Sequence, residues 1–206
     1  MVKSGEVING YRDQILIMAE PLNKFFNDNV EYRNQLLIFA SSCMDALQII
    51  GFYRWSRFGS SWRFMITFMF FYVFRVLVQS LWYIEKPPGY DWGFPGYMSI
   101  FVGYGTTTDF FYSGHVGCCV VHALEFNTVG WNIMSYFAIF AMFTQAFTMV
   151  VLRSHYTVDM IAGVIFAHYG FILVERYIYL VDYHMFGIPL EKRMATSNED
   201  FKGDHP

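Results

Sequence analysis

Charged residues are scarce in this chain, and their scarcity excludes most soluble folds. Of the 206 residues, only 15% are Asp, Glu, Lys or Arg, whereas 55% are hydrophobic and 21% are aromatic. The net charge of −3 and the lack of any basic block argue against a nucleic-acid partner. The apolar segments are too long and continuous for a soluble domain of this size. We therefore expect an all-α, polytopic transmembrane helical bundle.

Cysteine is equally rare, and its placement excludes a disulfide framework. Cys43, Cys118 and Cys119 all fall inside apolar stretches, and two of them are adjacent, so we interpret them as small core residues. Residues 1–35 lack both the apolar core of a cleavable signal and the Arg-rich character of a transit peptide. The sequence has no recognisable targeting signal. We expect the protein to lie in the endomembrane system (ER or Golgi), with the mitochondrial inner membrane as the alternative.

Five apolar stretches predict membrane spans, at residues 36–53, 64–84, 110–126, 131–152 and 156–176. They place a transmembrane bundle within residues 36–182. Residues 1–35 form a polar segment that is either an interfacial helix or a tail docked on the bundle, and residues 183–206 form a polar tail. The 54–63 loop carries three arginines and no acid, so we place it in the cytoplasm and the acidic 85–109 loop on the other side.

Two short motifs carry the ionisable groups that matter most. The first is Ser113-Gly114-His115, and the second runs from His155 to Asp159. His155 and Asp159 are four residues apart, so on a helix they lie on one face. About forty residues separate the two histidines, which as helix is roughly two crossings of a ~30 Å hydrocarbon core. We therefore expect one site on the non-cytoplasmic side.

Acid–base and nucleophilic chemistry explains this set better than its rivals do. His155, oriented by Asp159, is suited to attack phosphorus, and His115 to protonate the departing oxygen. A metal site with two histidines and one carboxylate is the first alternative, but Ser-Gly-His is not a metal signature. Core satisfaction is the second, and it explains isolated histidines such as His122 and His168 better than it explains the pair.

Other polar residues in the spans have competing interpretations. Arg75, in the second span, is suited to hold a phosphate, although a buried ion pair with Asp45 is the alternative. We interpret Asp45 and Gln48 as interhelical hydrogen-bonding residues. The aromatic residues of the 85–109 loop either mark the headgroup level of the bilayer or receive a quaternary ammonium group by cation–π contact. They are Tyr90, Trp92, Phe94, Tyr97 and Tyr104.

These motifs resemble those of the type 2 phosphatidic acid phosphatase superfamily. The closest resemblance is to its branch of sphingomyelin synthases and plant phosphatidylcholine:diacylglycerol cholinephosphotransferases. It extends over most of residues 21–182, including Trp62-Arg63-Phe64, Pro87-Pro88-Gly89 and Asp109. The resemblance implies that His155 is the nucleophile, Asp159 its orienting acid and His115 the leaving-group acid. Candidate substrate-binding residues are Arg75, Asp109, Ser113, Arg153 and Tyr156.

Departures from the superfamily pattern narrow the function. The first motif of the soluble-substrate phosphatases is missing, and Tyr112 rather than Pro precedes Ser113, which favours a headgroup transferase. Most relatives have six spans, whereas we count five.

We expect a phosphotransferase that moves phosphocholine or phosphoethanolamine from a membrane phospholipid to diacylglycerol or ceramide by a phosphohistidine, without a metal or other cofactor. A lipid phosphatase or phospholipase C-type hydrolase is one alternative. A non-catalytic, lipid-binding subunit of a larger membrane complex, possibly mitochondrial, is the other.

Overall fold

The computed structural model describes residues 13–81, 84–105 and 110–188, and every regular element within these ranges is a helix. Predictions that concern residues 1–12, Asp109 and the tail from residue 189 lie outside the described residues. The helices are α1 (Gln14–Met18), α2 (Glu20–Asp28), α3 (Val30–Phe58), α4 (Arg63–Leu81), α5 (Gly114–Thr128), α6 (Asn132–Val151) and α7 (Thr157–His184). The predicted fold class, an all-α membrane bundle, is confirmed.

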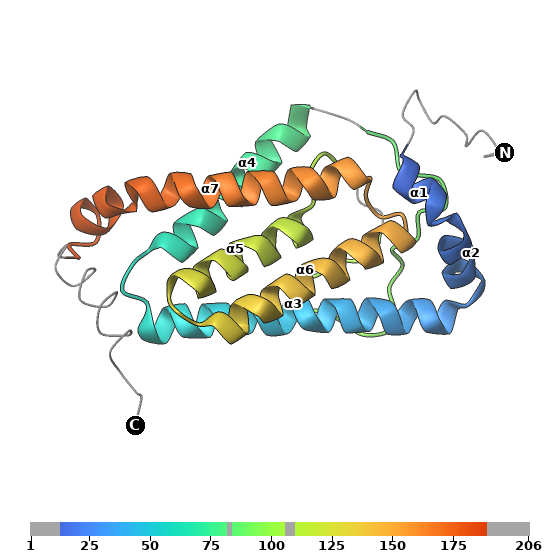
Figure 1. Cartoon of the computed structure of the whole chain (residues 1–206), viewed down its shortest axis with the longest axis horizontal. Coiled ribbons are helices and arrows are strands. Elements are labelled where there is room, and N and C mark those ends of the chain that lie inside the picture. Colours follow the sequence, from blue (N-terminus) through green and yellow to red (C-terminus); the bar gives the residue numbers. More distant parts are fainter. Residues whose placement is uncertain (1–12, 82–83, 106–109, 189–206) are drawn as a thin grey trace.

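Helices α3 to α7 form one bundle with α5 at its centre (Figure 1). Helix α5 packs against α3, α4, α6 and α7, and 11 of its 15 residues are buried. The chain crosses the bundle five times in alternating directions. The start of α5, the end of α6 and the start of α7 therefore lie toward the same end, on the right in Figure 1. This end holds the candidate site.

Within the described residues, four helices rather than five are long and apolar enough to cross a membrane: α3, α4, α6 and α7. The predicted span at 110–126 is the exception, because its helix begins only at Gly114 and has 15 residues. That length gives about 22 Å of helix, short of a ~30 Å hydrocarbon core. A central helix surrounded by the other four need not match the bilayer, since it hardly meets lipid. The first span is longer than expected and begins at Val30 rather than near residue 36.

The outer faces of the long helices are apolar and exposed. On α4, α6 and α7 the exposed large side chains recur three or four residues apart, as on one face of a helix. They include Met69, Val73 and Val76 on α4, Tyr136, Phe140 and Phe143 on α6, and Ile161, Ile165 and Tyr169 on α7. A surface of this kind is compatible with lipid rather than water.

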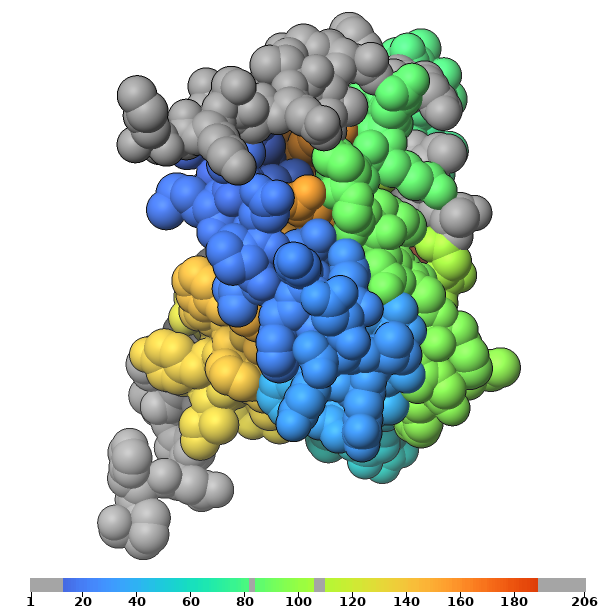
Figure 2. All heavy atoms as spheres, turned by 90° about the vertical axis from the view of Figure 1, so that its right-hand side faces the viewer, coloured from blue at the N-terminus to red at the C-terminus, as the bar shows by residue number. Residues whose placement is uncertain are grey.

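Two segments cover the end of the bundle that holds the candidate site. Helices α1 and α2 dock there, so residues 13–28 form helices at the bundle end. The 84–105 loop lies beside them and is fastened to α3, because the Asp45 carboxylate accepts hydrogen bonds from Ser99 Oγ and from the backbone N–H groups of Ile100 and Phe101. Figure 2 views this end: the chain near the start of α7 (orange) shows between α1–α2 (blue) and the loop (green).

Candidate active site

Two glycines bring the histidine-bearing ends of α5 and α7 into contact. A Cβ atom on Gly163 of α7 would lie 2.7 Å from the backbone oxygen of Ser113, and one on Gly117 of α5 would lie 3.1 Å from the Gly163 oxygen. Real Cβ atoms do not occur at the first distance, and at the second the two backbones would have to move apart by a few tenths of an ångström, so glycine permits the close approach. Ser113 N–H also donates to the Asp159 carbonyl at 2.9 Å. The crossing thereby places the Ser113–His115 motif beside the His155–Asp159 motif.

The His155–Asp159 pair is buried and fully organised. His155 Nδ1 lies 3.1 Å from Asp159 Oδ2, and the two residues are 4% and 0% exposed. Asp159 also accepts hydrogen bonds from the backbone N–H of Tyr156 at 3.0 Å and of Phe111 at 3.2 Å. A carboxylate bound to Nδ1 favours the tautomer in which Nδ1 carries the proton, which leaves the lone pair of Nε2 for nucleophilic attack.

His115 lies in the first turn of α5 and is partly exposed. The ring of Trp92, from the 84–105 loop, packs against it with 5.8 Å between ring centroids. Ser113 precedes it as the N-cap: its hydroxyl accepts the Val116 N–H at 3.3 Å and donates to Met149 Sδ at 3.2 Å. Since Ser113 is completely buried, its side chain fixes the start of α5.

Arg75 lies beside the start of α5. Its Nε donates to the Tyr112 carbonyl at 3.3 Å, and a Cβ atom on Gly114 would lie 3.1 Å from the same nitrogen. The guanidinium therefore packs on the residue before His115, toward the end of the bundle where the histidines lie. The alternative in which Asp45 pairs with Arg75 is not what the structure contains, because the Asp45 oxygens bind the 99–101 segment of the loop.

Comparison with known proteins assigns the chain to a family. Residues 16–175, more than half of the chain, match AtPDCT1/2, the family of phosphatidylcholine:diacylglycerol cholinephosphotransferases. The chain belongs to this family. No curated protein and no solved structure gives a significant match. The cholinephosphotransferase branch of the resemblance is thus supported, and the match does not bear directly on the wider phosphatase superfamily.

In this cholinephosphotransferase-family chain, Arg153 follows the C-terminus of α6 in the left-handed conformation that glycine usually adopts at helix ends. It ends α6 with φ +51°, and the Arg153 and Ser154 N–H groups donate to the Val150 and Met149 carbonyls, as in a Schellman motif. Its guanidinium donates to the carbonyls of Pro88 at 2.7 Å and Leu16 at 3.2 Å. The side chain predicted to bind substrate therefore joins the His155 turn to two other segments.

Tyr156 and Asp109 complete the predicted substrate-binding set. The Tyr156 hydroxyl donates to the Glu85 carbonyl at 3.0 Å. Burial, together with the nearby carboxylates, raises the pKa of Tyr156, which keeps the phenol protonated at neutral pH. Tyr156 thus joins the start of α7 to the beginning of the α4–α5 connection, four residues after α4 ends. Asp109 lies outside the described residues.

Sequence reasoning missed two residues that hold the site end of this family member together. Asn23 of α2 is 5% exposed and donates to the carbonyls of Gly89 and Val151, at 3.1 and 2.8 Å. Asp13 accepts hydrogen bonds from Thr157, at the start of α7. Asp13 stands in a polar segment, and Asn23 lies on the amphipathic helix α2, whose pattern does not single out one buried polar residue. The only sequence signal is that Asp is a common N-cap residue before a helix.

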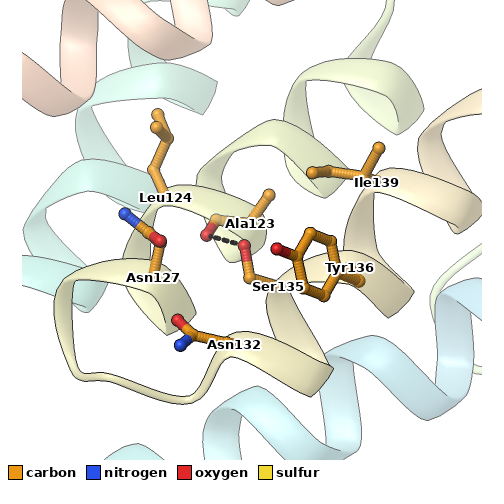
Figure 3. A pocket seen from close by; sticks show the side chains of 7 residues that line it. All are labelled: Ala123, Leu124, Asn127, Asn132, Ser135, Tyr136 and Ile139. Carbon is orange, nitrogen blue, oxygen red and sulfur yellow. Dashed lines mark hydrogen bonds between the residues drawn. The ribbon is translucent and has the colours of Figure 1, made fainter.

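A groove between α5 and α6 lies away from the histidines (Figure 3). Its volume is about 240 Å³, and the Ser135 hydroxyl on its wall donates to the Ala123 carbonyl at 2.8 Å. Its lining belongs to the last turns of α5 and the first turns of α6, at the other end of the bundle: Ala123, Leu124, Asn127, Asn132, Ser135, Tyr136 and Ile139. It is therefore not part of the histidine site.

Proposed function

We propose that this protein is a lipid headgroup phosphotransferase that moves phosphocholine from phosphatidylcholine to diacylglycerol through a phosphohistidine on His155. The observation that carries the proposal is the buried 3.1 Å contact between His155 Nδ1 and Asp159, in a segment that the α5–α7 crossing brings against Ser113, two residues before His115. Membership in the cholinephosphotransferase family supports both lipids as substrates.

In the first half-reaction, His155 Nε2 attacks the phosphorus of the donor lipid. The bond between phosphorus and the glycerol oxygen breaks, and His115 gives its proton to that oxygen, so diacylglycerol departs. Asp159 accepts the Nδ1–H hydrogen bond and stabilises the positive charge that the imidazole ring gains. Arg75, which packs beside the start of α5, stabilises charge on the non-bridging oxygens in this proposal.

In the second half-reaction, the hydroxyl of another diacylglycerol replaces the one that left. His115, now without its proton, takes the hydroxyl proton as the oxygen attacks phosphorus. The phosphorus–nitrogen bond breaks, and the electron pair returns to His155 Nε2. The products are a new phosphatidylcholine and an enzyme in its starting protonation state, so no oxidant, reductant or other cofactor enters the balance.

Fewer observations support the other substrates and roles that the sequence predicted. Phosphoethanolamine as headgroup uses the same steps, and so does hydrolysis, in which water replaces the acceptor hydroxyl. The family match gives no support to ceramide as acceptor or to membership of a larger membrane complex. We retain the endoplasmic reticulum membrane as the proposed location, in keeping with the family and with the apolar helices.

A vesicle assay tests the proposal and its rivals together. Purified protein would be placed in vesicles of phosphatidylcholine or phosphatidylethanolamine with fluorescent diacylglycerol or fluorescent ceramide. We expect fluorescent phosphatidylcholine from diacylglycerol and no phosphocholine in solution. His155→Ala should abolish the product, whereas His168→Ala, which removes an exposed histidine from α7, should not. Soluble phosphocholine instead of transfer would indicate the hydrolase, and equal transfer by His155→Ala would overturn the mechanism.

A further inference from the structure

A carboxylate from the N-terminal segment binds the start of α7. Asp13 Oδ2 accepts the backbone N–H of Thr157 at 2.6 Å, and Asp13 Oδ1 accepts the Thr157 hydroxyl at 2.9 Å. Asp13 is also the N-cap of α1, where it accepts the N–H groups of Ile15 and Leu16. One side chain therefore ties α1 to the first residue of α7, two positions from His155 and two from Asp159.

A second contact joins α1 to the other side of His155. Arg153, two residues before the histidine, donates to the carbonyl of Leu16 on α1 at 3.2 Å. Leu16 is itself 5% exposed, so α1 is packed rather than loosely attached. The turn that presents His155 is thus held at Arg153 and at Thr157 by the same short helix.

This turn needs outside support because its own backbone is unfavourable. Arg153 adopts φ +51°, a left-handed conformation that residues with a side chain rarely adopt. The first N–H groups of a helix also lack partners within that helix. Two carboxylates supply them here: Asp159 accepts from Tyr156 N–H, and Asp13 accepts from Thr157 N–H. Asp159 is then aligned on His155 by a helix start that Asp13 helps to fix.

We propose that Asp13 is a positioning residue for His155, and that α1 together with Asp13 fixes the turn from Arg153 to Thr157 at both of its ends. Asp13 acts through Thr157 and does not touch the reacting atoms. The inference rests on the proposed function, because it takes His155 as the nucleophile. It adds that the segment before the bundle is required for transfer.

The test compares Asp13 variants with a matched control on the same segment. Asp13→Ala removes both acceptors of Thr157, Asp13→Asn keeps one amide oxygen, and Glu20→Gln neutralises an exposed acid of α2. Misplacing a reacting group by about 1 Å costs up to ~100-fold in rate. We therefore expect kcat to fall about 10- to 100-fold in Asp13→Ala and less in Asp13→Asn. The KM for phosphatidylcholine should stay within about twofold, and Glu20→Gln should match wild type.

Hydrogen exchange at the Tyr156 and Thr157 amides gives a second readout that does not depend on turnover. We expect faster exchange there in Asp13→Ala and unchanged exchange in Glu20→Gln. Thr157→Val, which removes only the hydroxyl contact, should lower kcat in the same direction by a smaller factor. It serves as the second variant if Asp13→Ala does not fold.

Wild-type kcat and wild-type exchange in Asp13→Ala would overturn the inference. If His155→Ala retains transfer while exchange still rises in Asp13→Ala, the proposed mechanism fails, but the inference that Asp13 fixes the turn from Arg153 to Thr157 is supported.

Discussion

Asp159 is the residue on which the geometry of the site depends most. Its two oxygens accept three hydrogen bonds, from His155 Nδ1 and from the backbone N–H groups of Tyr156 and Phe111. Phe111 belongs to the segment before α5, and Tyr156 belongs to the segment before α7. Phe111 has φ +112°, rare for a bulky residue, so the backbone is strained beside the site. One carboxylate thus orients the histidine and also joins the two turns.

Replacing Asp159 by Asn should abolish most activity. Either orientation of the amide turns its NH2 group toward a backbone N–H, since each carboxylate oxygen already accepts one. The amide also fails to stabilise a positively charged imidazole. We expect transfer to fall by roughly 10²- to 10⁴-fold. The free energy of unfolding should fall by about 1–3 kcal/mol, as for a buried polar group left unpaired. Initial transfer rates and thermal melts of the purified protein measure both, and wild-type rates would contradict the assignment.

Replacing Arg75 by Lys tests the proposed phosphate contact. Lysine keeps the positive charge but loses the planar set of donors that matches phosphate oxygens. We expect kcat/KM to fall about 10-fold or more, with the protein still folded. Arg57→Lys is the matched control, because Arg57 is exposed at the far end of α3. Equal kcat/KM for the Arg75 and Arg57 variants would argue against a contact between Arg75 and substrate.

At the scale of elements, the α5–α7 crossing brings the Ser113–His115 segment beside the start of α7. Gly163 faces backbone atoms of Ser113, which cannot move aside without moving the start of α5. Gly170, two turns later on α7, faces only the ring of Phe70, where an added Cβ would lie 3.1 Å from the nearest carbon. Replacement by alanine should therefore displace the backbone at Gly163 but only a side chain at Gly170.

Gly163→Ala should separate α5 from α7 and lower activity more than stability alone explains. We expect transfer to fall about 10- to 100-fold, as for a misplaced catalytic group. Gly170→Ala, the control on the same helix, should stay within about twofold of wild type because a side chain can yield. Transfer rates of both variants, measured below their melting temperatures, make the comparison. Equal activity of the two alanine variants would show that the close approach does not set the site.

The helices were predictable from the sequence because long apolar runs leave few other structures inside a membrane. The pairing of His155 with Asp159 was predicted from helical spacing, and the two side chains do meet. His155 nevertheless lies in the turn before α7 rather than on the helix, so the contact also depends on the conformation of that turn. The length of α5 was not, because a helix shielded by its neighbours is freed from matching the bilayer. Contacts such as Asp13 with Thr157 join residues 144 positions apart through single hydrogen bonds, and no local pattern encodes them.

At the scale of the whole molecule, the two ends of the bundle differ in chemistry. The site end carries the histidines, α1–α2 and the 84–105 loop. The other end carries three arginines, which the sequence placed in a loop but which the structure places on helices: Arg54 and Arg57 on the last turns of α3 and Arg63 at the start of α4. Arg63 forms a double hydrogen bond with Glu125 at 2.9 and 3.1 Å. Positively charged connections face the cytoplasm in most membrane proteins. The charge distribution therefore predicts that the site opens on the non-cytoplasmic side.

Labelling of introduced cysteines tests this orientation. Cys43, Cys118 and Cys119 are buried, so a membrane-impermeant maleimide should label the unaltered protein weakly. In sealed microsomes we expect Arg57→Cys to react at once and Met98→Cys, at a residue 78% exposed on the 84–105 loop, to react only after permeabilisation. The opposite order of labelling would reverse the predicted topology.

The most direct test of the account is to isolate the covalent intermediate. Wild-type protein would be mixed with phosphatidylcholine labelled in its headgroup, without added acceptor, then denatured rapidly at alkaline pH, digested and analysed by mass spectrometry. We predict one phosphocholine group on the peptide that contains His155, its loss when diacylglycerol is added, and none in His155→Ala. Efficient transfer by folded wild-type protein with no modification of His155, or undiminished transfer by His155→Ala, would contradict the account.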